Sequence, residues 1–175
     1  MTGLEPSSFH LRRRSALAIA RAGLAAAFLA TSFAATAQDQ RAPSTQDVIF
    51  ARKTLMNAIC EKMAKIERMI SLGQIDLADA HQHADAISVM FMAFPHLFPP
   101  SSNLWTLNVD PDPATDTYAS QELWTRFSDF YQRAAAASQT AHEMSRADEI
   151  DDFKTRAREL RITCDTCHAL YSETQ

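Results

Sequence analysis

The sequence predicts an all-α protein, an antiparallel four-helix bundle with one long loop between its second and third helices. Only one glycine, Gly73, follows residue 37 of the 175-residue chain. No stretch alternates apolar and polar residues as a half-buried strand would. Glycine is common in the turns between strands, so its scarcity argues against a sheet. Apolar residues instead recur at spacings of three, four and seven, which is typical of amphipathic helices.

The first 37 residues differ in composition from the rest and have the pattern of a secretory signal peptide. Three arginines at positions 12–14 precede a stretch rich in Ala, Leu and Phe, which ends in Ala-Thr-Ala at positions 35–37. A charged segment, an apolar segment and a small-residue cleavage site define such a signal. Arg21 leaves the apolar run short of the ~20 residues of a membrane-spanning helix, although an uncleaved anchor is the alternative. We therefore expect a signal peptide over residues 1–37, a mature domain over residues 38–175 and export to the periplasm.

The mature part of the chain is acidic. The signal segment holds four arginines and one glutamate, so residues 38–175 carry 13 basic and 20 acidic residues, a net charge of −7. This balance, without a basic cluster, argues against nucleic acid and anionic membranes as partners. The mature length is enough for one hydrophobic core.

The first helix is expected from Ser44 to near Leu72. Ser44 with Asp47 three residues later has the pattern of a helix N-cap, and Gly73 suits the position just past a helix end. The apolar positions between them are Val48, Leu55, Met56, Ile59, Met63, Ile66 and Ile70.

The second helix is expected over about residues 75–93, because Pro95 ends it. Residues 94–117 hold five of the six prolines that follow residue 37, so they form the long loop. Loops of this length are usually functional or crossovers, and we expect its Phe and Trp residues to pack on the bundle. The third helix is expected over about residues 120–141.

The fourth helix is expected from a cap at Ser145 to about Tyr171, and it carries the one sharp chemical signal. Residues 164–168 read Cys-Asp-Thr-Cys-His, the C-x-x-C-H pattern of c-type haem attachment. Residues three apart lie on one face of a helix, so both thiols can reach the two vinyl groups of haem and form thioethers. His168 then offers an imidazole nitrogen to the iron. Attachment also accounts for an odd number of cysteines in an exported chain.

Two other readings of the motif are weaker. A thioredoxin-like C-x-x-C begins a helix in a βαβ setting, whereas this pair lies at a helix end in a chain without predicted strands. A structural zinc site needs four ligands. His81 and His83 are two apart and point to different helix faces, and the chain has no second cysteine pair.

The chain resembles the cytochrome c′ family, the class II c-type cytochromes, over essentially the whole mature part. The specific feature is the C-x-x-C-H almost at the C-terminus. The other similar segments are DVIFARKTLM at 47–56, FPHLFPP at 94–100, and Glu122-Leu-Trp124.

This resemblance implies one covalently attached haem c and a homodimer through the first two helices. Thioethers are implied at Cys164 and Cys167, with His168 as the proximal iron ligand. Arg52 is implied near a propionate, where a guanidinium pairs well with a carboxylate; an ordinary surface arginine is the alternative. Trp124 is implied at the haem edge, with an ordinary core tryptophan as its alternative.

The residue opposite His168 is expected to be a methionine. Helix geometry leaves Met56, Met90 and Met92 as candidates near that end of the bundle, and the resemblance selects Met56. We expect Met56 to be a lid that does not bond the iron. Cys60, one turn later, is expected to be a small buried apolar residue. The remaining methionines are expected to fill the core: Met63, Met69, Met90 and Met92.

The expected function is that of a periplasmic haem protein. It would transfer single electrons, bind a small gas such as NO or CO at a five-coordinate haem, or do both, with an unspecified redox partner. One alternative is a six-coordinate electron carrier like cytochrome c-556, with Met56 as distal ligand; another is a haem-free helical interaction protein. No Ser/His/Asp set, phosphate loop or paired carboxylates stand out, so we do not expect an enzyme.

Overall fold

The computed structural model describes residues 42–105 and 118–173. The signal peptide predicted over residues 1–37 lies outside the described residues, and so does the later part of the long loop. Within the two described stretches, no helix has both the length and the apolar character needed to cross a membrane.

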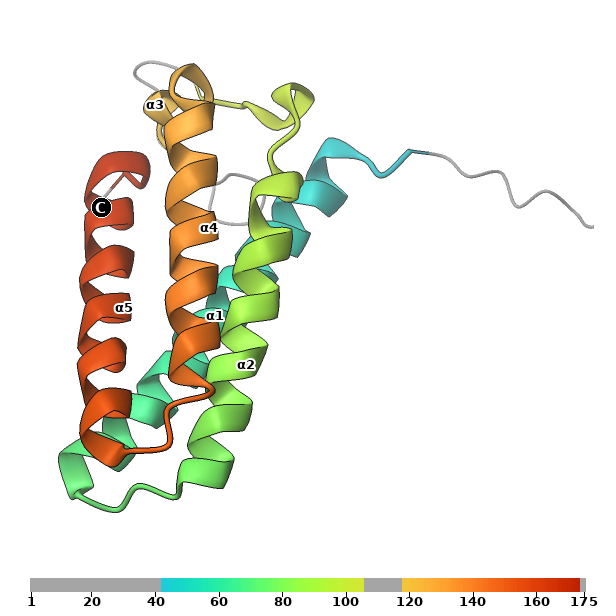
Figure 1. Ribbon diagram of the computed structural model, residues 1–175. Coiled ribbons are helices and arrows are strands. Elements are labelled where there is room, and N and C mark those ends of the chain that lie inside the picture. Colours follow the sequence, from blue (N-terminus) through green and yellow to red (C-terminus); the bar gives the residue numbers. More distant parts are fainter. Residues whose placement is uncertain (1–41, 106–117, 174–175) are drawn as a thin grey trace, which may run out of the picture. The chain divides into compact units, whose positions relative to one another are not determined.

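Four long helices form an antiparallel bundle, as the sequence predicts (Figure 1). In Figure 1 the connections from α1 to α2 and from α4 to α5 lie at the lower end of the bundle. The C-terminal end of α5, the end of α2 and the start of α4 lie at the upper end. The four helices are α1 (Thr45–Leu72), α2 (Leu77–Ala93), α4 (Phe127–Met144) and α5 (Ile150–Tyr171).

Three short helices cover the upper end of the bundle. They are η1 (Phe94–Leu97), η2 (Pro100–Ser102) and α3 (Gln121–Thr125). The segment before α3 is tied to the end of α5, because the Ser120 N–H donates to the Tyr171 carbonyl at 2.9 Å and Ala119 bridges to Ser172. The loop from α2 to α4 therefore packs against the helix end that carries the C-x-x-C-H motif.

Helix α1 begins and ends where the sequence predicts. The Asp47 N–H donates to Ser44 Oγ at 3.2 Å, and the Ser44 N–H donates to Asp47 Oδ2 at 3.0 Å, which forms a capping box. Gly73 has a φ of 64°, a left-handed conformation that glycine adopts without the strain of a Cβ.

Two predicted helix boundaries are wrong. The third helix is broken at Arg126, whose φ of −119° and ψ of 35° separate α3 from α4. The break lets Leu123 of α3 and Phe130 of α4 reach the same apolar cluster. Ser145 closes α4 instead of opening α5, because its Oγ donates to the His142 carbonyl at 2.7 Å. Its hydroxyl thereby satisfies one of the free carbonyls at a helix end. Helix α5 begins after Glu149.

The buried side chains form two apolar clusters along the bundle. The first cluster includes Ile59, Ile66, Ile87, Met144, Phe153 and Leu160. The second cluster consists of Phe94, Phe98, Leu123, Phe130 and Tyr171. Cys164 packs against the first cluster and Cys167 against the second, so the two thiols lie where the clusters meet.

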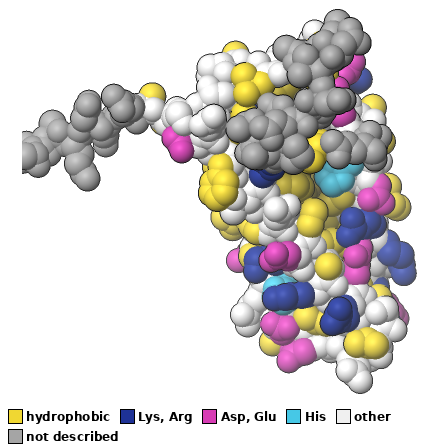
Figure 2. Space-filling model, turned by 180° about the vertical axis from the view of Figure 1, so that it is seen from behind, with side chains coloured by type: hydrophobic (Ala, Val, Ile, Leu, Met, Phe, Trp, Pro, Cys, Tyr) yellow, Lys and Arg dark blue, Asp and Glu magenta, His cyan; other side chains and the backbone are white. Residues whose placement is uncertain are grey.

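Charged and apolar side chains are distributed unevenly over the surface. Figure 2 shows acidic and basic side chains intermixed over the lower part of one face, with apolar side chains gathered higher on it. The upper part is where the second cluster and the short helices lie.

Candidate haem-binding site

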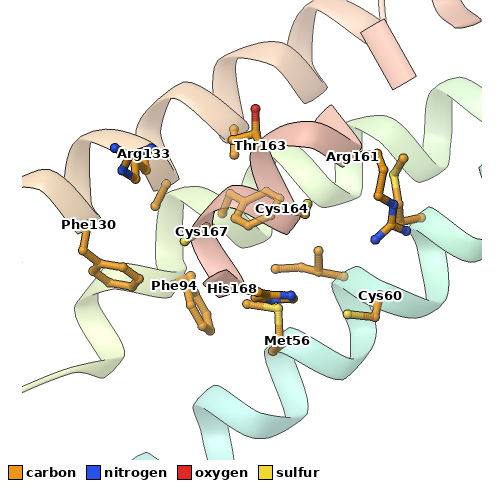
Figure 3. A pocket seen from close by; sticks show the side chains of 15 residues that line it. Met56, Cys60, Phe94, Phe130, Arg133, Arg161, Thr163, Cys164, Cys167 and His168 are labelled. Carbon is orange, nitrogen blue, oxygen red and sulfur yellow. The ribbon is translucent and has the colours of Figure 1, made fainter. Parts of the chain in front are cut away.

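The last turns of α5 present the C-x-x-C-H motif to a cavity inside the bundle. Cys164, Cys167 and His168 are all half-buried, and all three line this first cavity (Figure 3). The two cysteines are one helical turn apart, which places both thiols on one face of α5. The predicted attachment residues are therefore brought together at one wall of one cavity.

A second cavity adjoins the first. It is lined by Arg52 and Ser172 among others, and it shares five lining residues with the first: Met56, Phe94, Phe130, Cys167 and His168. The two cavities enclose about 530 and 750 Å³ of empty space, part of which opens to solvent. His168 lines both cavities, so the two adjoin at its imidazole.

Aromatic side chains form a contiguous part of the cavity walls. The Phe98 and Phe130 rings lie 5.0 Å apart, and the Phe94 and Phe98 rings 5.1 Å apart, both with edge-to-face geometry. Phe130 also meets the Tyr171 ring at 5.6 Å. This geometry is favourable for aromatic pairs, and it gives the site rigid apolar walls.

Burial keeps both motif thiols neutral. It raises the pKa of Cys164 to about 11 and raises the pKa of Cys167 in the same direction. Because the thiolate is the form that exchanges with disulfides, burial slows oxidation of this pair in the haem-free chain. The thiols are thus preserved for attachment.

Arg52 is a buried cation at the second cavity. Its side chain is only 2% exposed, and its guanidinium donates from Nη1 to Ser102 Oγ at 2.9 Å and from Nη2 to the Ser102 carbonyl at 3.2 Å. Arg52 Nε has no hydrogen-bond partner in the described part of the chain, where no ion pair involves Arg52 either. Burial lowers the pKa of Arg52 to about 10. A buried charge without a counter-ion is costly, so this position favours an acidic group in the cavity.

Trp124 lies beside Arg52 and not in either cavity wall. The Arg52 guanidinium lies 5.6 Å from the Trp124 ring and 4.7 Å from the Phe98 ring. The buried Trp124 Nε1 has no hydrogen-bond partner among the residues that the structure describes. The predicted contact of Trp124 with the haem edge stays a prediction.

Met56 is the candidate methionine that lines both cavities. Figure 3 shows its side chain and that of His168 approaching each other from α1 and α5. Met90 packs against the first apolar cluster, and Met92 is 65% exposed. The expectation that Met92 fills the core is wrong, because the neighbouring Phe91 takes the core position at that turn of α2.

Cys60 is exposed, so the expectation of a buried apolar residue is wrong. Successive residues on a helix point about 100° apart, and the neighbouring Ile59 occupies the buried direction. Cys60 nevertheless lines the first cavity at its edge.

Sequence reasoning missed two features of the site. Ser102 is the fully buried partner of Arg52, and it lies 50 residues away in the chain, so no local pattern connects them. Asp129 and Arg133 form an ion pair beside the first cavity, with Nε 2.7 Å from Oδ2. Their spacing of four on a helix was a usable signal for the pair, but not for its place beside the motif.

The residues present fit a covalently attached haem. Two thiols and an imidazole share the end of one helix and line adjoining cavities, and a buried guanidinium has a donor free in the described structure. This combination defines a c-type haem protein.

Comparison of the sequence with known protein families also indicates a c-type haem protein and identifies its family. Residues 47–172 match the family model described as cytochrome C′. The chain belongs to the cytochrome c′ family, and with it the chain has one covalently attached haem c.

Solved structures share the fold at low sequence identity. Cytochrome c′ from Thermochromatium tepidum is 18% identical, with a TM-score of 0.65 over 75% of this chain and 98% of that one. A cytochrome c′ described as having an unusual ligand-controlled dimer dissociation is 20% identical, with a TM-score of 0.65 over 77% and 100%. Oxidised cytochrome c556 of R. palustris is 18% identical, with a TM-score of 0.60 over 74% and 98%. Comparison with curated protein sequences gave no significant match.

The pairing of Arg52 with Ser102 yields a prediction about stability. Ser102→Ala removes the Oγ that accepts from the buried guanidinium, so we expect unfolding to become easier by about 1–3 kcal/mol. Urea unfolding followed by circular dichroism measures this change. Ser101→Ala, at the adjacent exposed position, is the matched control and should change little. Equal effects of the two substitutions would contradict the assigned role of Ser102.

Proposed function

We propose that this protein is a periplasmic cytochrome that transfers single electrons, binds NO or CO, or does both, at a five-coordinate haem. The single observation that carries the proposal is the C-x-x-C-H motif facing a cavity that has one imidazole on one wall and Met56 on another. Export rests on the pattern of residues 1–37. Catalysis on an organic substrate is not part of the proposal.

The roles of the residues follow from their chemistry. Cys164 and Cys167 form the two thioethers, and His168 supplies the proximal imidazole. When bound, the haem iron supplies a one-electron couple and an axial position for a small gas. Arg52 holds an acidic group of the cofactor at the second cavity, where its Nε is available in the described structure. Aromatic side chains supply part of the apolar wall of the site.

The thioether assignment predicts how many thiols stay free. In the denatured holoprotein we expect one reactive thiol per chain, that of Cys60, because Cys164 and Cys167 are consumed. Cys164→Ala and Cys167→Ala should each leave a single thioether, visible by mass spectrometry as haem retained on the chain. His168→Ala should keep the attachment and lose most of the native redox behaviour.

The control for this experiment is Cys60→Ser, which should retain haem fully and show no free thiol. A pyridine haemochrome assay on protein made with a c-type maturation system tests the haem assignment itself. Absence of covalent haem would favour a haem-free interaction protein. Haem retained by the double variant Cys164→Ala/Cys167→Ala under denaturing conditions would contradict the two thioethers.

The role of Met56 separates the two candidate cytochromes. A thioether sulfur can bond haem iron, and the sulfur-bearing side chain lies opposite His168 in both cavities, which favours a six-coordinate carrier as the second candidate. An unbranched methionine also fills apolar space well without bonding. We propose the second role, with Met56 as a lid.

Electron paramagnetic resonance of the oxidised protein distinguishes these roles. With Met56 as a lid, we expect a signal with high-spin character that Met56→Ala leaves essentially unchanged, because no ligand is lost. Met56→Leu is the conservative control and should behave like the wild type. A purely low-spin signal that becomes high-spin in Met56→Ala would establish the six-coordinate carrier instead.

A homodimer through α1 and α2 is part of the proposal. Phe50 near the start of α1 is 71% exposed and Met92 near the end of α2 is 65% exposed. The two helices are antiparallel neighbours, so these ends lie at the same end of the bundle. One structural neighbour is described by its dimer dissociation, which is consistent with a dimer here.

Substitution of these exposed residues tests the dimer. Burying one large apolar side chain contributes about 1.5–3 kcal/mol, so Phe50→Glu should weaken association by at least about tenfold. Sedimentation velocity at micromolar concentration measures the change. Ile162→Glu, at a position 65% exposed on α5, is the control and should leave the dimer intact. A wild-type protein that sediments only as a monomer would contradict the proposal.

A further inference from the structure

Side chains from α4, from α5 and from the break before α4 approach one carboxylate oxygen beside the haem-binding site. Arg133 Nε donates to Asp129 Oδ2 at 2.7 Å, and the Tyr171 hydroxyl donates to the same oxygen. Arg126 Nη2 lies 3.7 Å from it. We call Asp129, Arg133 and Tyr171 the Asp129 cluster.

The Asp129 cluster reaches both cavities. Arg133 lines the first cavity together with Cys164, Cys167 and His168. Tyr171, three residues after His168 on α5, lines the second. Asp129 lines neither cavity, so one carboxylate behind the walls fixes a cation at one cavity and a phenol at the other.

Asp129, Arg133 and the neighbouring Arg126 together carry two positive charges and one negative charge. Arg133 and Arg126 share the single carboxylate of Asp129, and Tyr171 adds a neutral donor. Hydrogen bonds from Arg133 and Tyr171 lower the pKa of Asp129, so it stays ionised and the group carries a net positive charge.

The other arginine of the first cavity is in a different position. Arg161 lies 2.6 Å from Glu67 and 3.7 Å from Asp165, so two carboxylates offset its charge. In the view of Figure 3, Cys164 and Cys167 lie between Arg161 and Arg133.

We propose that Asp129 and Tyr171 position Arg133 so that a fixed positive charge borders the attached haem and raises its reduction potential. The inference rests on the proposed attachment at Cys164, Cys167 and His168. Oxidised haem carries one more positive charge than reduced haem, so a cation held beside it opposes oxidation. Charge and hydrogen bonding around a cofactor are general means by which proteins set its potential. Arg133 is thus a positioning residue for charge and not an iron ligand.

Spectroelectrochemical titration of the holoprotein tests the proposal. At a fixed applied potential, Arg133→Gln should lower the ratio of reduced to oxidised haem by about three- to tenfold, as expected for a unit charge at moderate range. A tenfold change corresponds to 59 mV for a one-electron couple. Arg133→Lys, which keeps the charge, should restore most of the wild-type ratio.

The matched control is Arg126→Gln. Arg126 approaches the same carboxylate, but its side chain is 52% exposed and lines neither cavity, so the ratio should change by less than about twofold. Equal shifts in Arg133→Gln and Arg126→Gln would show that any surface charge changes the potential by the same amount. That result would overturn the proposal. An unchanged ratio in Arg133→Gln would overturn it as well.

A second variant covers the case in which Arg133→Gln does not fold. Tyr171→Phe keeps every charge but removes one donor to Asp129, which leaves more negative charge on the carboxylate and should lower the ratio. No change in Tyr171→Phe would then count against the cluster. The same samples are assayed for pyridine haemochrome. Absence of covalent haem from the wild type defeats the proposed function, whereas covalent haem with an unmoved potential defeats only this inference.

Discussion

Two apolar clusters fill the bundle, and the rest of the site depends on the gap between them. Protein interiors are close-packed, and unfilled space between core side chains loses the dispersion contacts that would stabilise the fold. The first cavity draws its walls from both clusters, with Ile59 and Ala137 from one and Phe94 and Phe130 from the other. The bundle therefore keeps a space that its own side chains do not fill. A haem attached there completes the core and stabilises the folded chain, because its apolar surface is removed from water only when the chain folds.

The motif lies on the boundary of this gap because of the period of one helix. Cys164 packs against the first cluster and Cys167 against the second, one turn apart on α5. A cofactor joined to both thiols therefore ties the two halves of the core together. At the upper end of the bundle the unfilled interaction is polar. Arg52 is buried and donates to Ser102, yet its Nε is unpaired within the described residues. The apolar space favours an apolar ring system, and the Arg52 charge favours an acidic group. A haem has both, in its porphyrin ring and its propionates.

Local sequence patterns predicted most of the fold and the centre of the site. Three features depend on only a few neighbouring residues each: the capping box at Ser44, the left-handed Gly73 and the C-x-x-C-H motif. The break at Arg126 was not predicted, because it arises where α3 and α4 both turn apolar residues to one distant cluster. The Arg52 partner was not predicted either, since it lies in the loop after α2. The predictions for Cys60 and Met92 were wrong because helix periodicity indicates only which broad side of a helix is apolar. On that side the adjacent residues, Ile59 and Phe91, are the buried ones.

Helices carry the C-x-x-C-H motif and the charged side chains that line the cavities, so a change of charge there need not move the site. Cys167, His168 and Tyr171 share one helix, and the bond from Tyr171 to Asp129 fixes α5 against α4. Side chains on packed helices hold their positions better than those on loops. A change in charge at Arg133 therefore acts on an unmoved cofactor position, since the apolar walls and the thioethers hold that position independently. Under the proposals made above, the two clusters fix the position of the haem and the charges around them tune its reduction potential.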